Sequence, residues 1–156
     1  MYMSKFKIVL VAPEIPGNTG SIGRTAVALD LELILIKPLA FDIDEKAVRR
    51  AGLDYWKYVS LKIYENWDDF MKAENPSPDK MFLFSRFATK PIFEVKITKD
   101  SYLVFGSETK GLPTEIKDQF IDQLVTLPMN SEHIRSLNLA NAATAAAYEA
   151  LRQIDY

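Results

Sequence analysis

Short apolar runs alternate along the chain with segments of helical periodicity. Six runs predict buried strands at 7–13, 32–38, 58–64, 81–85, 101–106 and 123–128. Helical patterns are found at 24–31, 42–52, 66–75, 114–120 and, rich in alanine, at 135–153. Apolar strands that alternate with helices predict an α/β fold with a mostly parallel sheet and helices on both faces. The 156 residues contain no repeat or linker, so we expect a single domain over 1–156.

Three segments with unusual polar chemistry follow predicted strands, at 13–24, 106–113 and 128–138. Ligands of open α/β sheets bind outside the carboxyl ends of the strands, because the connecting loops meet there. These segments therefore predict a functional site at this edge of the sheet.

The first segment, PEIPGNTGSIGR, has the composition of a glycine-rich loop that leads into a helix. Glycines allow a ligand to approach the backbone closely, and free N–H groups at a helix start suit an anion. Asn18 and Arg24 are its candidate ligand contacts. The spacing is equally compatible with Asn18 as a helix cap and Arg24 as a solvated surface residue.

The second segment, FGSETKGLP, places Gly106 and Gly111 on either side of Glu108, which is typical of a tight turn. The Glu108 carboxylate has two candidate roles: it accepts hydrogen bonds from backbone N–H groups of a neighbouring loop, or it faces a cationic ligand. A polar surface turn without function is the alternative.

The third segment, LPMNSEHIRSLNLAN, enters the last helix near Ser136, which resembles a helix N-cap. Asn138 and Asn141 are three residues apart and would share a helix face. Capping and a solvated first turn would explain the same residues without a ligand.

Composition excludes several kinds of site. The chain has no cysteine and a single histidine, His133, which excludes disulfides, thiol catalysis and a multi-histidine metal site. We therefore expect no metal. No apolar run approaches the roughly 20 residues of a membrane span, so we also expect no membrane contact and a cytoplasmic location. The net charge of −2 means that any nucleic-acid surface must be a local patch.

Taken together, PEIPGNTGSIGR, FGSETKGLP and IRSLNLANAAT resemble, in order and spacing, the three motifs of SpoU-type SPOUT RNA methyltransferases. RRAGLDYW at 49–56 adds to the resemblance, which covers essentially the whole chain. It is closest to the minimal, TrmL/YibK-like tRNA 2′-O-methyltransferases, which modify the wobble cytidine or uridine of the anticodon. The resemblance also implies a C-terminal trefoil knot, which periodicity and composition do not indicate.

The resemblance implies S-adenosylmethionine as cofactor, held bent by the second and third segments. The residues that it assigns to the cofactor pocket are Phe84, Gly106, Leu127, Met129, Ser136 and Leu137.

For catalysis, the resemblance places Arg24 beside the reacting ribose, supported by Asn18, Glu108, Ser136 and Asn138. A guanidinium is effectively always protonated, so Arg24 is a poor general base on its own. Two roles stay open: an RNA phosphate helps to remove a proton, or Arg24 clamps phosphate and stabilises the forming alkoxide.

The expected partner is the anticodon stem-loop of tRNA. Candidate RNA contacts are the basic residues Lys46, Arg49, Arg50, Lys57 and Arg86, with Lys90 nearby. A solvated helix face is an equal alternative for the first four. Tyr55 and Trp56 are candidates both for base stacking and for the core.

The alanine-rich helix predicts a homodimer. Alanine buries little apolar area, so this helix is a poor cover for a core, but its small side chains allow another helix backbone to approach closely. The resemblance also implies a dimer with the active site at the interface.

Three other functions remain open at this point. The same transfer could act at another tRNA or ribosomal RNA site, the chain could be a non-catalytic RNA-binding protein of this fold, or it could be a generic nucleotide-binding α/β protein. Arg24, Glu108 and Asn138 favour catalysis.

Overall fold

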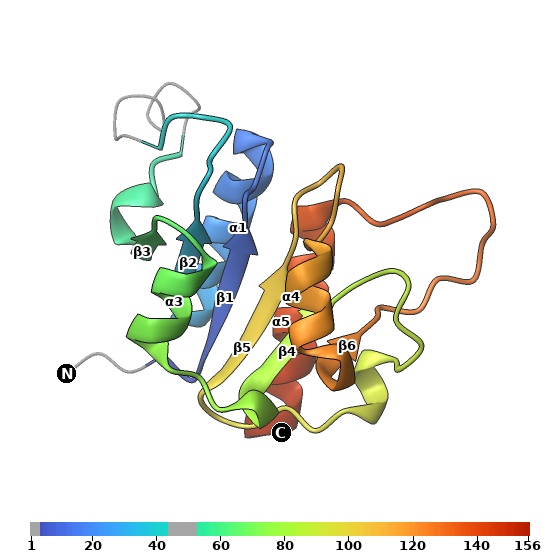
Figure 1. The fold of residues 1–156 in the computed structure, drawn as a ribbon. Coiled ribbons are helices and arrows are strands. Elements are labelled where there is room, and N and C mark those ends of the chain that lie inside the picture. Colours follow the sequence, from blue (N-terminus) through green and yellow to red (C-terminus); the bar gives the residue numbers. More distant parts are fainter. Residues whose placement is uncertain (1–3, 44–52) are drawn as a thin grey trace.

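The protein is built on one six-stranded sheet (Figure 1), and the computed structural model describes residues 4–43 and 53–156. The strand order is β3-β2-β1-β5-β4-β6. The strands are β1 (Phe6–Val11), β2 (Glu32–Ile36), β3 (Ser60–Tyr64), β4 (Met81–Phe84), β5 (Ser101–Phe105) and β6 (Leu124–Val125). All five strand pairings are parallel, which confirms the predicted sheet type.

Helices cover both faces of the sheet, as predicted. One face carries α1 (Pro16–Leu29) and α5 (Leu139–Asp155), which pack with Ile8 and Leu10 of β1. The other carries α3 (Trp67–Glu74) and α4 (Thr114–Gln119), which pack with Val9 and Val11. Short 3-10 turns complete the described chain at Trp56–Tyr58, Pro78–Lys80, Ile92–Glu94 and Ile121–Gln123. The predicted knot stays a prediction, because strand order does not define how the chain is threaded.

The first polar segment is mostly helix, and its prediction as a loop was wrong. Helix α1 begins at Pro16, a residue that suits the first helical position because its missing N–H would have no partner there. The glycines leave room for the chain near residue 53 and beyond. A Cβ on Gly20 would lie 2.6 Å from Leu53 Cδ1, and one on Gly23 would lie 2.6 Å from Trp56 Cζ3. These two glycines therefore serve close packing.

The boundaries of the other helices and strands differ less from the predicted ones. β6 has only two residues where a strand over 123–128 was predicted, and β3 begins at Ser60. Asn66, the first residue of the helical pattern at 66–75, caps α3, since its side chain accepts a hydrogen bond from Asp69 N at 2.8 Å. Residues 44–52 of the helix predicted at 42–52 lie outside the described residues, and with them Lys46, Arg49 and Arg50.

The alanines of α5 face the chain's own core. Ala143, Ala146 and Ala147 are completely buried against the sheet and α1. Beside them, the hydroxyls of Thr25 and Thr144 lie 2.7 Å apart, which joins α1 to α5. The idea that this helix makes a poor core cover was wrong, because small side chains let it lie close to the sheet and to α1. Its expected packing against a partner chain stays a prediction.

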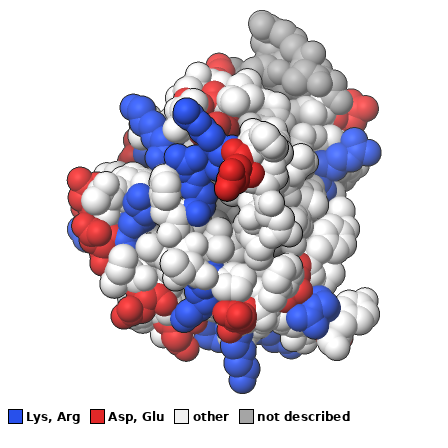
Figure 2. All heavy atoms as spheres, turned by 90° about the vertical axis from the view of Figure 1, so that its right-hand side faces the viewer, with Lys and Arg blue, Asp and Glu red and all other residues white. Residues whose placement is uncertain are grey.

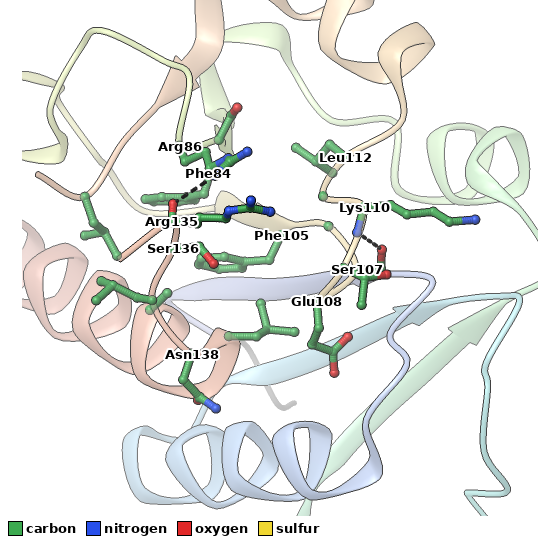
Figure 3. Close-up of a pocket in the computed structure, with 18 of the residues that line it drawn as sticks. Phe84, Arg86, Phe105, Ser107, Glu108, Lys110, Leu112, Arg135, Ser136 and Asn138 are labelled. Atoms are coloured by element: carbon green, nitrogen blue, oxygen red, sulfur yellow. Dashed lines mark hydrogen bonds between the residues drawn. The ribbon is translucent and has the colours of Figure 1, made fainter. Parts of the chain in front are cut away.

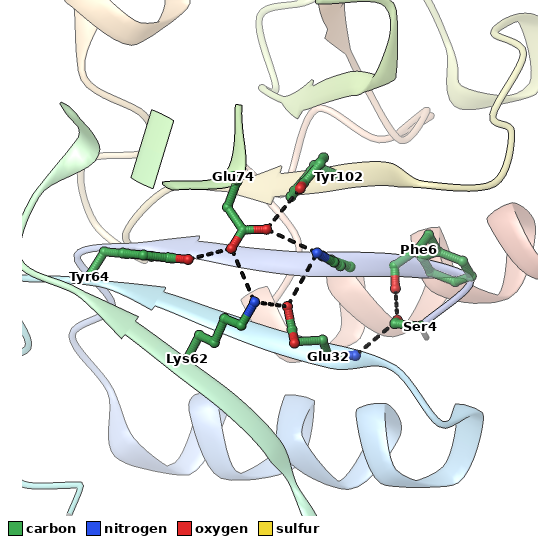
Figure 4. A network of polar contacts seen from close by, with 8 residues as sticks. Ser4, Phe6, Glu32, Lys62, Tyr64, Glu74 and Tyr102 are labelled. Carbon is green, nitrogen blue, oxygen red and sulfur yellow. Dashed lines mark hydrogen bonds and ion pairs between the residues drawn. The ribbon is translucent and has the colours of Figure 1, made fainter. Parts of the chain in front are cut away.

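A charged network covers the amino-terminal half of the other sheet face (Figure 4). The hydroxyl of Tyr102 and the ammonium of Lys7 donate to one carboxylate oxygen of Glu74, at 2.8 and 2.9 Å. The Tyr64 hydroxyl donates to the other oxygen, which also lies 3.4 Å from Lys62 Nζ. The Glu74 side chain is only 4% exposed, so these partners replace its water.

Burial alone would raise the pKa of Glu74, but the hydrogen bonds from Tyr64, Lys7 and Tyr102 outweigh it and lower the pKa to about 2. Burial, together with the hydrogen bond to Glu74, raises the pKa of Tyr102 to about 12. The network thus keeps Glu74 ionised and Tyr102 protonated across the physiological pH range.

We expect Glu74→Gln to lower the free energy of unfolding at pH 7 by on the order of 2 kcal/mol. The folded pKa of Glu74 lies below its ordinary value of 4.5, so its contribution is present above pH 4.5 and is lost as the pH falls toward 2. Urea unfolding between pH 2 and 7 should show parent and variant converging at low pH. The control is Glu65→Gln, whose exposed side chain should contribute almost nothing. A pH-independent difference would contradict this account.

We expect Ala146→Leu to destabilise the folded chain by about 1–3 kcal/mol, because the extra methylenes have no space in the core. Ala73→Leu, on the exposed side of α3, is the matched control and should leave the unfolding midpoint unchanged. Equal midpoints for the two variants in urea would show that α5 does not pack as described.

Candidate active site

A cavity of about 630 Å³ opens at the carboxyl ends of β4 and β5, the edge at which the sequence predicted a site. We call it the pocket (Figure 3). It brings together all six residues predicted for cofactor binding: Phe84, Gly106, Leu127, Met129, Ser136 and Leu137. Four further predicted residues also line it: Asn18, Arg86, Glu108 and Asn138. The pocket is of the size that encloses a cofactor-sized ligand.

An aromatic pair lies inside the pocket. The rings of Phe84 and Phe105 stack with centroids 4.6 Å apart and planes at 10°, one from the end of each strand. Leu112 and Leu127 add apolar surface. Apolar walls of this kind bind the flat and hydrophobic parts of a ligand, while the polar residues around them fix its orientation.

The turn after β5 is as tight as its glycines predicted. Ser107 and Gly111 exchange two backbone hydrogen bonds, of 2.9 and 3.3 Å. A Cβ on Gly106 would lie 2.1 Å from the backbone carbon of Gly111, and Gly111 itself has a φ of +68°. Larger residues at either position would distort the turn. The turn holds Glu108 outward, toward the start of α1 (Figure 3).

The Glu108 carboxylate is bound to the start of α1. It accepts hydrogen bonds from the backbone N–H groups of Glu14 and Ile15, at 2.8 and 2.7 Å, and from the Asn18 amide at 3.2 Å. We call these three contacts the Glu108 clasp. They confirm the first of the two predicted roles for Glu108, acceptance from a neighbouring loop. The anion expected at this helix start is therefore a side chain of the chain itself.

Three further hydrogen bonds extend the clasp. In the reverse direction, the Glu14 carboxylate accepts from Thr109 N and Thr109 Oγ1, at 3.2 and 2.7 Å, and these bonds lower the pKa of Glu14. The Asn18 side-chain oxygen accepts from the Asn138 amide at 3.1 Å. Hydrogen bonds thus join the first polar segment to the second and to the third, both of which follow it by more than 80 residues in the chain.

Asn138 is the N-cap of α5, and the prediction of Ser136 as the cap was wrong. The Asn138 side chain accepts from Asn141 N at 3.1 Å, whereas Ser136 lies two residues before it, in the exposed segment that lines the pocket. Asparagine caps as well as serine, so composition alone could not choose between them. Ser136 is thereby left free to contact a ligand.

Several residues of the pocket were not predicted. Arg135, Lys110 and Lys117 also line it and, with Arg86, give it four cationic side chains. Arg86 Nη1 donates to the backbone oxygen of Arg135 at 3.2 Å, which ties the segment after β4 to the third polar segment. Figure 2 shows the side of the molecule that lies at the right in Figure 1, and Lys and Arg side chains gather in the upper left part of this view. Lys110 lies within the second polar segment and Arg135 within the third, so the motifs themselves could have indicated these two residues.

Arg24 does not line the pocket of its own chain. It lies on the exposed side of α1, with its guanidinium carbon 5.5 Å from the centre of the Tyr55 ring. Lys57 is also outside the pocket, exposed beside Tyr58. Among the described residues that line the pocket, Glu108 carries the only carboxylate, and no histidine is present.

Comparison with known proteins identifies the family of the chain. The sequence model of the SpoU rRNA Methylase family matches residues 5–148. The chain belongs to this family. It is 45% identical over 152 residues to a tRNA (cytidine(34)-2'-O)-methyltransferase of Saccharophagus degradans, covering 97% of both chains.

Solved structures of family members have the same fold. A structure concerned with 2-OH methylation of C/U34 on tRNA superposes with a TM-score of 0.86 and 40% identity, covering 96% of both chains. The SpoU methyltransferase AviRb of Streptomyces viridochromogenes, in complex with AdoMet, superposes with a TM-score of 0.80 and 30% identity, covering 97% of this chain and 58% of that one. The chain is thus an RNA methyltransferase of the SpoU type.

We expect Glu108→Gln to lower the free energy of unfolding by about 1–3 kcal/mol, because an amide nitrogen would face N–H donors where a carboxylate oxygen now accepts. Urea unfolding measures this change. Glu132→Gln, in the exposed third segment, is the matched control and should be neutral. If both variants unfold like the parent, the clasp does not stabilise the fold.

Proposed function

We propose that the protein transfers a methyl group from S-adenosylmethionine to the ribose 2′-hydroxyl of the wobble cytidine or uridine in the tRNA anticodon. The observation that carries the proposal is the pocket, in which residues of all three polar segments meet at one edge of the sheet. The relative named for cytidine 34 of tRNA, similar over nearly its whole length, supports this substrate.

The pocket residues fit the cofactor. The Phe84–Phe105 pair and Leu127 suit adenine and ribose, and the backbone of the 106–111 turn offers polar groups. The cofactor's carboxylate can pair with one of the four cationic side chains. When bound, S-adenosylmethionine supplies a methyl group on a positively charged sulfur.

The chain's own residues must align the hydroxyl and neutralise its developing charge. The bond from the ribose oxygen to the methyl carbon forms as the carbon–sulfur bond breaks, and the electron pair of the broken bond stays on the sulfur. The hydroxyl proton passes to an RNA phosphate or to water. Glu108 acts as a positioning residue, because its oxygens are already engaged by the clasp. Ser136 and Asn138 lie at the pocket and can contact the ribose.

We infer that Arg24 binds an RNA phosphate and stabilises the negative charge that develops on the reacting oxygen.

Arg24 lies outside the pocket of its own chain, which supports a homodimer in which Arg24 serves the pocket of the partner protomer. The buried alanines do not argue for this dimer. Its support is the exposed face of the α1–α5 pair, which is small at Gly17, Ser21 and Ala145 and apolar at Tyr148. Light scattering at micromolar protein should give the mass of two chains, and a single-chain mass would exclude the dimer.

Nucleoside mass spectrometry tests the proposed reaction. Purified protein, S-adenosylmethionine and unmodified tRNA carrying cytidine or uridine at the wobble position should give the 2′-O-methylated nucleoside. Matched tRNA with a purine at that position should not. The family name favours one second candidate, the same transfer to ribosomal RNA, so a ribosomal RNA sample belongs in the same experiment. No methylation of either RNA would overturn the proposal.

We expect Arg24→Ala to slow single-turnover methyl transfer about a hundredfold or more and to leave cofactor binding nearly intact. Arg24→Lys should fail almost as badly, because lysine keeps the charge but loses the planar contact with phosphate. Lys72→Ala, on the exposed side of α3, is the control for the loss of one surface charge. A parental rate for Arg24→Ala would place the reacting ribose elsewhere.

A further inference from the structure

An exposed phenylalanine lies at the rim of the pocket. Phe87 lines the pocket, yet its side chain is 71% exposed, in contrast to Phe105 inside, which is 3% exposed. We propose that Phe87 is the platform on which an unpaired base of the RNA substrate stacks. This inference rests on the proposed function for its RNA, but on different residues and a different observation.

Hydrogen bonds and a cation hold the segment around Phe87. Its backbone N–H donates to Ser85 Oγ at 3.3 Å. The Arg86 guanidinium carbon lies 4.4 Å from the centre of the Phe87 ring, and the same guanidinium donates to the Arg135 backbone oxygen at 3.2 Å. The ring is thereby placed beside the third polar segment while most of its surface stays open to water. Single exposed apolar side chains are common on protein surfaces, but this ring is held at the rim of a pocket, where it can contact a bound ligand.

The charges around the ring identify its occupant. Lys117 Nζ lies 6.0 Å from the ring centre, and Lys110 and Arg135 line the same pocket. An aromatic face among cations matches single-stranded nucleic acid, whose bases stack while its phosphates pair with the cations. A bound RNA with its reacting nucleotide in the pocket would have neighbouring unpaired bases at this rim.

The aromatic residues that the sequence offered for stacking serve the fold. The Tyr55 hydroxyl donates to the backbone oxygen of Gly20 at 2.8 Å. The Trp56 ring is partly buried over Gly23, so close that a Cβ there would clash with it. Neither residue lines the pocket, whereas Phe87 does. Stacking at Phe87 also leaves the Phe84–Phe105 pair for the cofactor.

The first test is RNA affinity as a function of salt. We expect Phe87→Ala to weaken binding of an anticodon stem-loop RNA about tenfold and to leave the slope of log affinity against log salt unchanged. Lys117→Ala should instead reduce that slope. Phe87→Trp should bind like the parent, because it keeps an aromatic platform. The matched control is Phe93→Ala, whose ring is 66% exposed but does not line the pocket.

The second test identifies the stacked base. Abasic nucleotides placed one at a time in the anticodon loop should weaken binding to the parent. At the position of the stacked base, the abasic nucleotide should hardly weaken RNA binding to Phe87→Ala any further. The abasic nucleotide and the Phe87→Ala substitution would each remove the same stacking interaction. The KM for tRNA should rise in Phe87→Ala, while the single-turnover rate at saturating RNA and the affinity for S-adenosylmethionine stay near parental.

The outcomes separate the two proposals. Equal RNA affinity for Phe87→Ala and Phe93→Ala, or additive effects at every abasic position, would overturn stacking at Phe87. A loss of S-adenosylmethionine affinity without a loss of RNA affinity would assign the ring to the cofactor and also overturn it. If the parent binds RNA through Phe87 but methylates neither tRNA nor ribosomal RNA, the stacking inference stands and the proposed function fails.

Discussion

The Glu108 clasp is the interaction on which the site depends. One carboxylate accepts two backbone N–H groups at the start of α1 and the amide of Asn18, and Asn18 in turn binds the cap residue of α5. Without it, the helix start would need water or another anion to satisfy its donors, and only the Glu14–Thr109 bonds would hold the turn after β5 to the first segment. Because the clasp and the Asn18–Asn138 bond hold the three polar segments together, the pocket can have a fixed shape before a ligand binds.

The clasp also determines which side chains of the pocket are available to a ligand. It occupies the only carboxylate among the described pocket residues, so the pocket's free side chains are largely cationic or apolar. Such a lining suits an anionic ligand with flat rings, although the whole chain has a net charge of −2. The charged network around Glu74, by contrast, belongs to the amino-terminal half of the sheet and serves stability.

Much of the fold could be predicted from the sequence because its signals are local. Runs such as IVLV and LILI are buried on both faces, and this pattern alone predicts a parallel sheet. The start of α1 could not be predicted, because glycines and a proline indicate a loop unless the packing of Leu53 and Trp56 against them is known. Likewise the burial of the α5 alanines depends on how closely that helix approaches the sheet.

The site was predictable through its motifs and less so through its contacts. The motif resemblance named nine residues that line the pocket, and the search for cations named a tenth, Arg86, but their roles stay predictions. Residue types could not choose between the two roles of Glu108, because the choice depends on which N–H groups lie within reach. The position of Phe87 was equally hidden, since an aromatic residue after a strand is usually core.

Amide hydrogen exchange of the ligand-free protein, followed by NMR, tests the clasp most directly. The N–H groups of Glu14 and Ile15 lie before the first helical turn, where only the Glu108 carboxylate accepts from them. If the clasp holds the site together, both amides exchange as slowly as the interior of α1, and they exchange rapidly in Glu108→Ala while β1 stays protected. Rapid exchange at both positions in the parent would contradict a preformed pocket.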